Sequence, residues 1–208
     1  MRGFILHLGG VPGTGKSTVA ELLSGDLSCN IVEASEELKR LGLTEKDPTG
    51  RFTELAGVGG LEALVNGMRG LLDSNCIILV SVYPEALIPL TEEESIAVII
   101  LRLNPLSLEE RLKARGWPRA KVLENVIAEA TNYYHDVLQE YEDMVIEIDT
   151  TRKTPKAVTE EALERLLSMD AGFKVDWLED PAIIEALSKW LHEFDLYKER
   201  LLNGRSVY

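Results

Sequence analysis

Residues 10–17 read GVPGTGKS and match the phosphate-loop pattern G-x-x-x-x-G-K-[ST] at every fixed position. Glycines at these positions let the backbone curl, so that successive N–H groups point at phosphate oxygens. Lys16 would bridge the β- and γ-phosphates of a nucleotide, and the Ser17 hydroxyl would ligate Mg²⁺. The alternative is a glycine-rich turn that binds nothing. An apolar strand before the loop and an apolar-faced helix after it favour the phosphate loop.

A second segment that could act on phosphate is basic and runs from Arg102 to Lys121. Arg102 ends a predicted strand, where ligands of parallel α/β proteins bind. Arg111 and Arg115 are four residues apart and share one helix face. Phosphoryl transfer needs positive charge around the moving group, often on a flap that closes over it. The same pattern also fits a solvated basic helix paired with its own glutamates, and both interpretations stay open.

Short apolar runs alternate with longer helical patterns, which predicts a parallel α/β fold. Most of the strands are nearly continuous apolar runs, as expected when helices cover both faces. Ser107 and Glu110 have capping-box spacing, which marks the start of the fourth helix. The predicted strands are Phe4–Leu8, Asn30–Glu33, Ile77–Ser81, Ile96–Leu103 and Met144–Ile148. The predicted helices are Lys16–Ser24, Ser35–Leu41, Thr53–Leu72, Ser107–Arg115, Ala120–Tyr141 and Pro155–Leu167.

The pattern changes after Met169. Residues 170–172 indicate a linker, and Asp180 followed by Pro181 is typical of a helix N-cap and first helical position. Asn203-Gly204 could end this amphipathic helix. We expect it to pack back on the main domain, with a partner or dimer surface as the lesser alternative. A separate glycine cluster, Gly57–Gly60, predicts a break between helices.

The composition limits the classes of partner and compartment. Thirty-five acidic residues against 22 basic ones give a formal net charge of −13, which argues against a broad nucleic-acid surface. Cys29 and Cys76 lack metal-ligand spacing and are predicted to be small, partly buried residues in a reducing compartment. The longest apolar run, Ile96–Leu101, is too short to cross a bilayer. With no signal-peptide pattern at the start, we expect a cytoplasmic protein.

Two strings carry a family resemblance. Residues 10–18, GVPGTGKST, resemble the phosphate loop of adenylate kinases. The pattern from Leu101 to Glu129, which includes Arg115-Gly116-Trp117, resembles the adenylate kinase-like ATPases linked to small-ribosomal-subunit maturation, in their archaeal form. Phe173–Trp177 resembles a tail segment of archaeal members. The resemblance covers most of the chain and is weakest over Ala34–Asn75.

This resemblance implies a P-loop NTPase fold with a five-stranded parallel sheet flanked by helices. Residues 1–169 would form the nucleoside-monophosphate-kinase-like domain, with a monophosphate-binding insert at 33–56 and a short lid at 114–124. Residues 170–208 would be a C-terminal helical extension. Mg²⁺ would accompany ATP, and AMP would be the acceptor. The nucleotide-binding residues carried over are Gly13, Thr14, Gly15, Lys16, Ser17, Thr18 and Arg115, of which Lys16 and Arg115 would be catalytic.

The chain departs from the family after the third predicted strand, where Asp, a variable residue and His are usual. Ser81 stands at the carboxylate position and Tyr83 at the histidine position, while Glu85 could substitute from the loop. Three hypotheses follow. The chain is a monophosphate kinase using Mg-ATP, or a slow ATPase that assists assembly by binding a small-subunit ribosomal protein. The third is a nucleotide-binding module with little turnover, which the missing carboxylate suggests.

Overall fold

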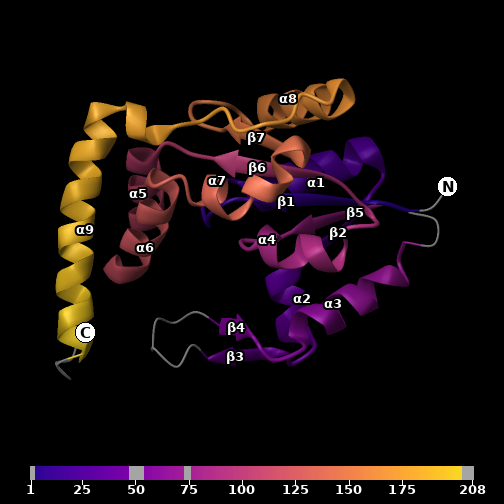
Figure 1. The fold of residues 1–208 in the computed structure, drawn as a ribbon, viewed down its shortest axis with the longest axis horizontal. Helices are drawn as coiled ribbons and strands as arrows, with labels where there is room; N and C mark the ends of the chain where they lie inside the picture. The colour runs from indigo at the N-terminus through magenta and orange to yellow at the C-terminus, as the bar shows by residue number, and fades with distance from the viewer. Residues whose placement is uncertain (1–2, 47–53, 73–75, 203–208) are drawn as a thin grey trace.

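The computed structural model describes residues 3–46, 54–72 and 76–202. Five strands form one parallel sheet in the order β2-β5-β1-β6-β7 (Figure 1). The predicted five-stranded parallel sheet is confirmed, and each predicted strand has a counterpart. The strands are β1 (Ile5–Gly9), β2 (Asn30–Glu33), β5 (Ile77–Val80), β6 (Ser95–Arg102) and β7 (Val145–Asp149).

Alternation along the strands builds a core on each face of the sheet. On one face, Leu6 and Leu8 of β1 pack with residues of α1 (Lys16–Leu27) and α8 (Pro155–Ser168). Ile5 of the same strand points to the opposite face and packs against α3 (Gly60–Arg69). The helices α4 (Pro84–Leu87), α6 (Arg119–Ala130) and α7 (Tyr133–Val137) also contribute to clusters on that face. Helices on both sides explain the continuous apolar strands.

A β-hairpin stands where the sequence predicts the beginning of a long helix. After α2 (Ala34–Arg40), the strands β3 (Thr44–Lys46) and β4 (Glu54–Ala56) pair antiparallel. The helix expected over 53–72 is therefore wrong in its first part, since only α3 is helical; Thr53 lies outside the described residues. Gly57–Gly60 accordingly separates a strand from a helix. Gly59 has φ 71°, which favours glycine, and it precedes the first residue of α3.

The fourth predicted helix, α5 (Pro105–Ala114), begins two residues earlier than its capping-box spacing indicates. The Asn104 side-chain oxygen accepts hydrogen bonds from the backbone N–H groups of Leu106 and Ser107, at 3.0 and 3.3 Å. Pro105 occupies the first helical position, which needs no N–H donor. The N-cap is therefore Asn104, and the start predicted at Ser107 is wrong.

The long helix predicted over 120–141 is broken. The helix α6 ends at Ala130, and Asn132 adopts a left-handed conformation with φ 54°. The chain then forms α7 and a 3₁₀ helix, η2 (Gln139–Met144). The break turns the buried ring of Tyr134 towards the sheet core, where it belongs to the same cluster as Val98 and Ile100.

The C-terminal segment packs back on the domain, as expected. After η3 (Trp177–Glu179), α9 (Pro181–Leu202) stands outside α5 and α6 (Figure 1). Asp180 accepts a hydrogen bond from the Ala182 backbone N–H at 2.9 Å, which confirms the predicted cap. The buried residues of α9 join the hydrophobic cluster that also contains Leu108 of α5 and Val122 of α6; they are Ile183, Leu187 and Trp190. The stop expected at 203–204 lies outside the described residues. Within the described chain, no helix has the length and apolarity to cross a membrane.

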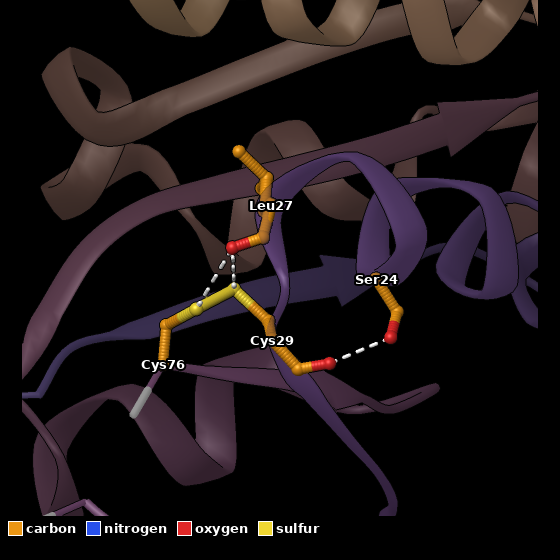
Figure 2. The surroundings of a disulfide bond; sticks show 4 residues. All are labelled: Ser24, Leu27, Cys29 and Cys76. Atoms are coloured by element: carbon orange, nitrogen blue, oxygen red, sulfur yellow. Dashed lines mark hydrogen bonds between the residues drawn. A yellow bond between two sulfur atoms is a disulfide. The ribbon is translucent and has the colours of Figure 1, made fainter. Parts of the chain in front are cut away.

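Cys29 and Cys76 form a disulfide, so the prediction that they are simply small, partly buried residues in a reducing compartment is wrong (Figure 2). The two residues immediately precede β2 and β5, which lie side by side in the sheet, and both are buried. The Ser24 hydroxyl of α1 donates a hydrogen bond to the Cys29 carbonyl oxygen at 2.6 Å. The bridge thus fastens the starts of two strands that are 47 residues apart in the chain.

Candidate nucleotide-binding site

The phosphate loop begins where β1 ends, at the carboxyl edge of the sheet. Gly10 and Gly13 have φ values of 139° and 100°, which favour glycine. A Cβ on Gly10 would lie 2.6 Å from the Leu101 carbonyl oxygen, and one on Gly13 would lie 2.9 Å from the Leu108 side chain. The loop therefore needs glycine both for its conformation and for its close contacts with β6 and α5.

Lys16 is the first residue of α1, and its side chain folds over the loop. Its Nζ donates hydrogen bonds to the carbonyl oxygens of Gly10 and Val11, at 2.7 and 3.2 Å. Burial lowers the pKa of Lys16 to about 8; Glu33 and Glu129 act in the opposite direction, and the Arg115 charge lowers it further. The ammonium group is thus placed inside a loop suited to phosphates, with its charge only weakly stabilised by the protein.

The three hydroxyl residues of the loop differ in their exposure to solvent. The Thr14 side chain is buried, and its hydroxyl donates to the Val11 carbonyl oxygen at 3.0 Å. Thr14 can therefore meet a nucleotide only through its backbone. Ser17 and Thr18 are exposed in the first turn of α1, where N–H groups and the helix dipole favour anions.

Two of the arginines singled out in the sequence lie at the loop. Arg111 of α5 donates a hydrogen bond from Nη1 to the Gly13 carbonyl oxygen at 2.7 Å. Arg115 is exposed at the C-cap of α5, and its charge lowers the pKa of Lys16, so the two cations share one electrostatic environment. Gly116, with φ 71°, then turns the chain toward α6. This arrangement gives the phosphate loop a cationic rim on the α5 side.

Arg102, which the sequence places at a strand end where ligands bind, is instead part of the core. Its side chain is fully buried and forms ion pairs with Glu129, at 2.7 Å, and with Glu147. Its Nη2 donates to the Asn132 side chain at 2.9 Å, and its guanidinium lies 5.9 Å from the Trp177 ring centre. Because a buried guanidinium needs these acceptors, Arg102 is unavailable to a nucleotide, and that prediction is wrong.

The tail segment Phe173–Trp177 completes this buried network. The backbone N–H groups of Lys174 and Val175 donate to Glu147 Oε2 at 2.6 and 2.7 Å. The Trp177 indole N–H donates to Glu129 Oε1 at 2.8 Å. The tail therefore supplies hydrogen bonds that two buried carboxylates require.

The loop after β5 lies against the phosphate loop and is tied to α7. The Ser81 hydroxyl accepts a hydrogen bond from the Tyr83 backbone N–H at 2.9 Å. The Tyr134 hydroxyl donates to the Val82 carbonyl oxygen at 2.9 Å, and Pro84 of the same loop packs against Gly9, where a Cβ would lie 2.9 Å from its ring. No motif in the sequence marks Tyr134 as part of the site, because its role depends on the helix break that precedes it.

The donor set at the loop fits a magnesium ion that arrives with the nucleotide. The Ser17 hydroxyl is exposed and makes no hydrogen bond to another described residue. Among the residues that the structure describes, no three His, Cys, Asp or Glu side chains form a metal cluster. In phosphate loops a Ser or Thr hydroxyl, phosphate oxygens and water hold the ion, and Ser17 is the residue that would do so here.

Known proteins with similar sequences and folds were compared with this chain. The AAA domain family matches residues 7–132. A chain of Thermococcus onnurineus named "Putative adenylate kinase" is 35% identical over 85% of this chain and 92% of its own length. One of the same name from Saccharolobus solfataricus is 28% identical, covering 92% of this chain and 98% of the relative.

Solved structures support the fold. A gluconokinase from Sinorhizobium meliloti gives a TM-score of 0.51 at 18% identity, covering 81% of this chain and 93% of that one. The shikimate kinase of Aquifex aeolicus gives a TM-score of 0.50 at 20% identity. The match covers 79% of this chain and 97% of the shikimate kinase. The chain therefore belongs to the AAA-domain family of P-loop proteins and, within it, to the group of archaeal chains that carry the name "Putative adenylate kinase".

Proposed function

We propose that the protein is a nucleoside-monophosphate kinase that transfers the γ-phosphoryl group of Mg-ATP to AMP. The observation that carries this proposal is the arrangement of Lys16, Arg111 and Arg115 around one complete phosphate loop. The name carried by its archaeal relatives supports the nucleotide acceptor. Residues 1–169 would form the catalytic domain, with an acceptor insert at 33–56 and a lid at 114–124, and residues 170–208 the extension.

The chemistry would rest on charge and position. Lys16 would leave the carbonyl oxygens of Gly10 and Val11 for the β- and γ-phosphates, which attract its charge more strongly. Arg115 would neutralise charge that develops on the moving group. The acceptor phosphate of AMP is already ionised, so no general base is needed. Mg²⁺, when bound through Ser17, supplies further neutralisation of the phosphates.

A coupled assay of ADP formation with ATP, Mg²⁺ and a panel of nucleoside monophosphates tests this function. We expect ADP formation to depend on AMP and to exceed the rates with other monophosphates. Lys16→Ala should lower nucleotide affinity or turnover at least roughly tenfold, about 1.4 kcal/mol. Lys156→Ala, a change at an exposed lysine of α8, is the matched control.

Two results would contradict the proposal. ADP release that is slow and unaffected by any monophosphate would indicate an ATPase, as in the assembly-factor hypothesis. A Lys16→Ala variant with wild-type affinity and turnover would refute the phosphate-loop assignment itself.

A further inference from the structure

The structure shows what has replaced the usual carboxylate at the end of β5. Ser81 continues the pairing with β1, since its backbone N–H donates to the Leu8 carbonyl oxygen at 3.1 Å. Its hydroxyl is engaged by the Tyr83 backbone N–H in a local turn. A hydroxyl used in this way brings no negative charge to the magnesium shell of a nucleotide.

Glu85, in the short helix α4 after β5, is one candidate to replace this carboxylate. Its surroundings do not favour a charged group that holds a magnesium shell. Its Oε1 accepts a hydrogen bond from the Tyr133 hydroxyl at 2.8 Å, and its buried Oε2 has no hydrogen-bond partner among the described residues. Burial also raises the pKa of Glu85. Burial disfavours the charged carboxylate that a hydrated cation attracts, and the Tyr133 hydroxyl already occupies one of its two oxygens.

Glu33 is better placed. It is the last residue of β2, and the parallel register sets it beside Val80, the residue immediately before Ser81. Neighbouring strands lie only about 4.8 Å apart, so Glu33 and Ser81 end adjacent strands at the same edge of the sheet. Glu33 is half-buried, and no hydrogen bond from another described residue engages its carboxylate. Its negative charge also acts on Lys16 in the phosphate loop.

We propose that Glu33 supplies the carboxylate that holds the water shell of the nucleotide's Mg²⁺, in place of the acid missing at Ser81. This inference rests on the proposed function, because it requires Mg-ATP in the phosphate loop. A carboxylate on the neighbouring strand restores the negative charge that Ser81 does not supply. The glutamate side chain is one methylene longer than that of aspartate, which extends its reach from β2.

The test measures binding of a non-hydrolysable ATP analogue by calorimetry, with Mg²⁺ and with EDTA. We expect Glu33→Gln to reduce the Mg²⁺-dependent gain in affinity roughly tenfold, while metal-free binding stays equal or tightens because a negative charge near Lys16 is removed. Glu36→Gln removes the same charge from an exposed position of α2 and is the matched control. Adding Ser81→Asp to Glu33→Gln should restore the gain.

Three results would overturn the inference. The Mg²⁺-dependent gain is unchanged in Glu33→Gln, or it is lost in Glu85→Gln instead, or Ser81→Asp fails to restore it in a double variant whose melting temperature is that of wild type. These leave the proposed function intact if wild type still phosphorylates AMP. A wild-type protein that binds no nucleotide overturns the proposed function and this inference together.

Discussion

At the scale of single residues, a bound nucleotide would change the protonation equilibrium of Lys16. Burial sets its pKa at about 8 in the free protein, and bound phosphates would raise that pKa because they favour the ammonium form. A group whose pKa rises on binding contributes full affinity below its free pKa and loses it as the pH rises above that value. Nucleotide affinity should therefore be sensitive to mildly alkaline pH.

This gives a pH prediction. The affinity for ATP measured by calorimetry should fall roughly tenfold to thirtyfold between about pH 7.5 and 9.5. Lys16→Arg is the control, because arginine keeps its charge over this range and its profile should be flat, whatever its absolute affinity. A wild-type affinity that stays constant to pH 9.5 would mean that Lys16 does not titrate in the free loop.

Arg115 carries the second residue-scale prediction. Because it is exposed at the end of α5, it contributes little to folding, and its charge should matter most when the lid closes over the phosphates. Arg115→Ala should lower kcat roughly tenfold or more and raise the KM for ATP less than that. Lys113→Ala, which removes a charge from the same helix turn, is the control. An unchanged kcat would remove Arg115 from the catalytic residues.

At the scale of elements, the disulfide joins the starts of β2 and β5, which carry Glu33 and Ser81 at their other ends. A bridge over 47 residues restricts the unfolded chain. Loop-closure entropy predicts that its loss costs about 4 kcal/mol of the free energy of unfolding. Urea unfolding with and without dithiothreitol measures this difference.

The control for that prediction is the double variant Cys29→Ala/Cys76→Ala, whose unfolding should not respond to the reductant. Two titratable thiols in the unreduced, denatured wild-type protein would show that the bridge does not form. In that case the starts of the two strands would be held by the β2–β5 pairing, the core beneath them and the Ser24 hydrogen bond to Cys29.

Also at this scale, α5 connects the loop to the rest of the molecule. Its residues Leu108 and Leu112 pack against Gly13, and its Arg111 donates a hydrogen bond to the Gly13 carbonyl oxygen. Glu109 of the same helix forms an ion pair with Arg119 of α6, which is also paired with Glu193 of α9. Residues 115–118 therefore connect two helices that an ion pair holds to each other.

At the scale of the whole molecule, α9 belongs to the same core as the sheet. Trp190 is buried, and its indole N–H donates to Glu109 at 3.1 Å. Trp190→Ala should lower the free energy of unfolding by about 3–5 kcal/mol, because it leaves a large cavity. The exposed neighbour Leu191 is the control, and its replacement by Ala should cost much less.

The shape of the unfolding transition shows whether α9 unfolds together with the rest of the domain. If the tail shares the domain core, Trp190→Ala shifts one cooperative transition measured by both far-UV circular dichroism and tryptophan fluorescence. A separate early transition, with the main one unmoved, would show that residues after 170 fold as an independent unit.

Several features were determined by local sequence alone. The conformation of the phosphate loop could be predicted because its glycines and Lys16 lie within one eight-residue stretch between a strand and a helix. The strands could be predicted because burial on both faces produces continuous apolar runs. The Asp180 cap was equally local, since its hydrogen bond spans two residues.

Other features were decided only by the tertiary structure, because their partners are distant along the chain. Arg102 has the sequence context of a ligand-binding residue. In the fold it is buried and pairs with Glu129 and Glu147, which are 27 and 45 residues away in the chain. Cys29 and Cys76 are adjacent only through strand pairing. Arg111 meets Gly13 across 98 residues, and Glu33 stands beside the end of β5 only in the folded sheet. Spacing in a sequence records neighbours on one element, whereas a site built from several strand ends depends on the order in which the sheet places them.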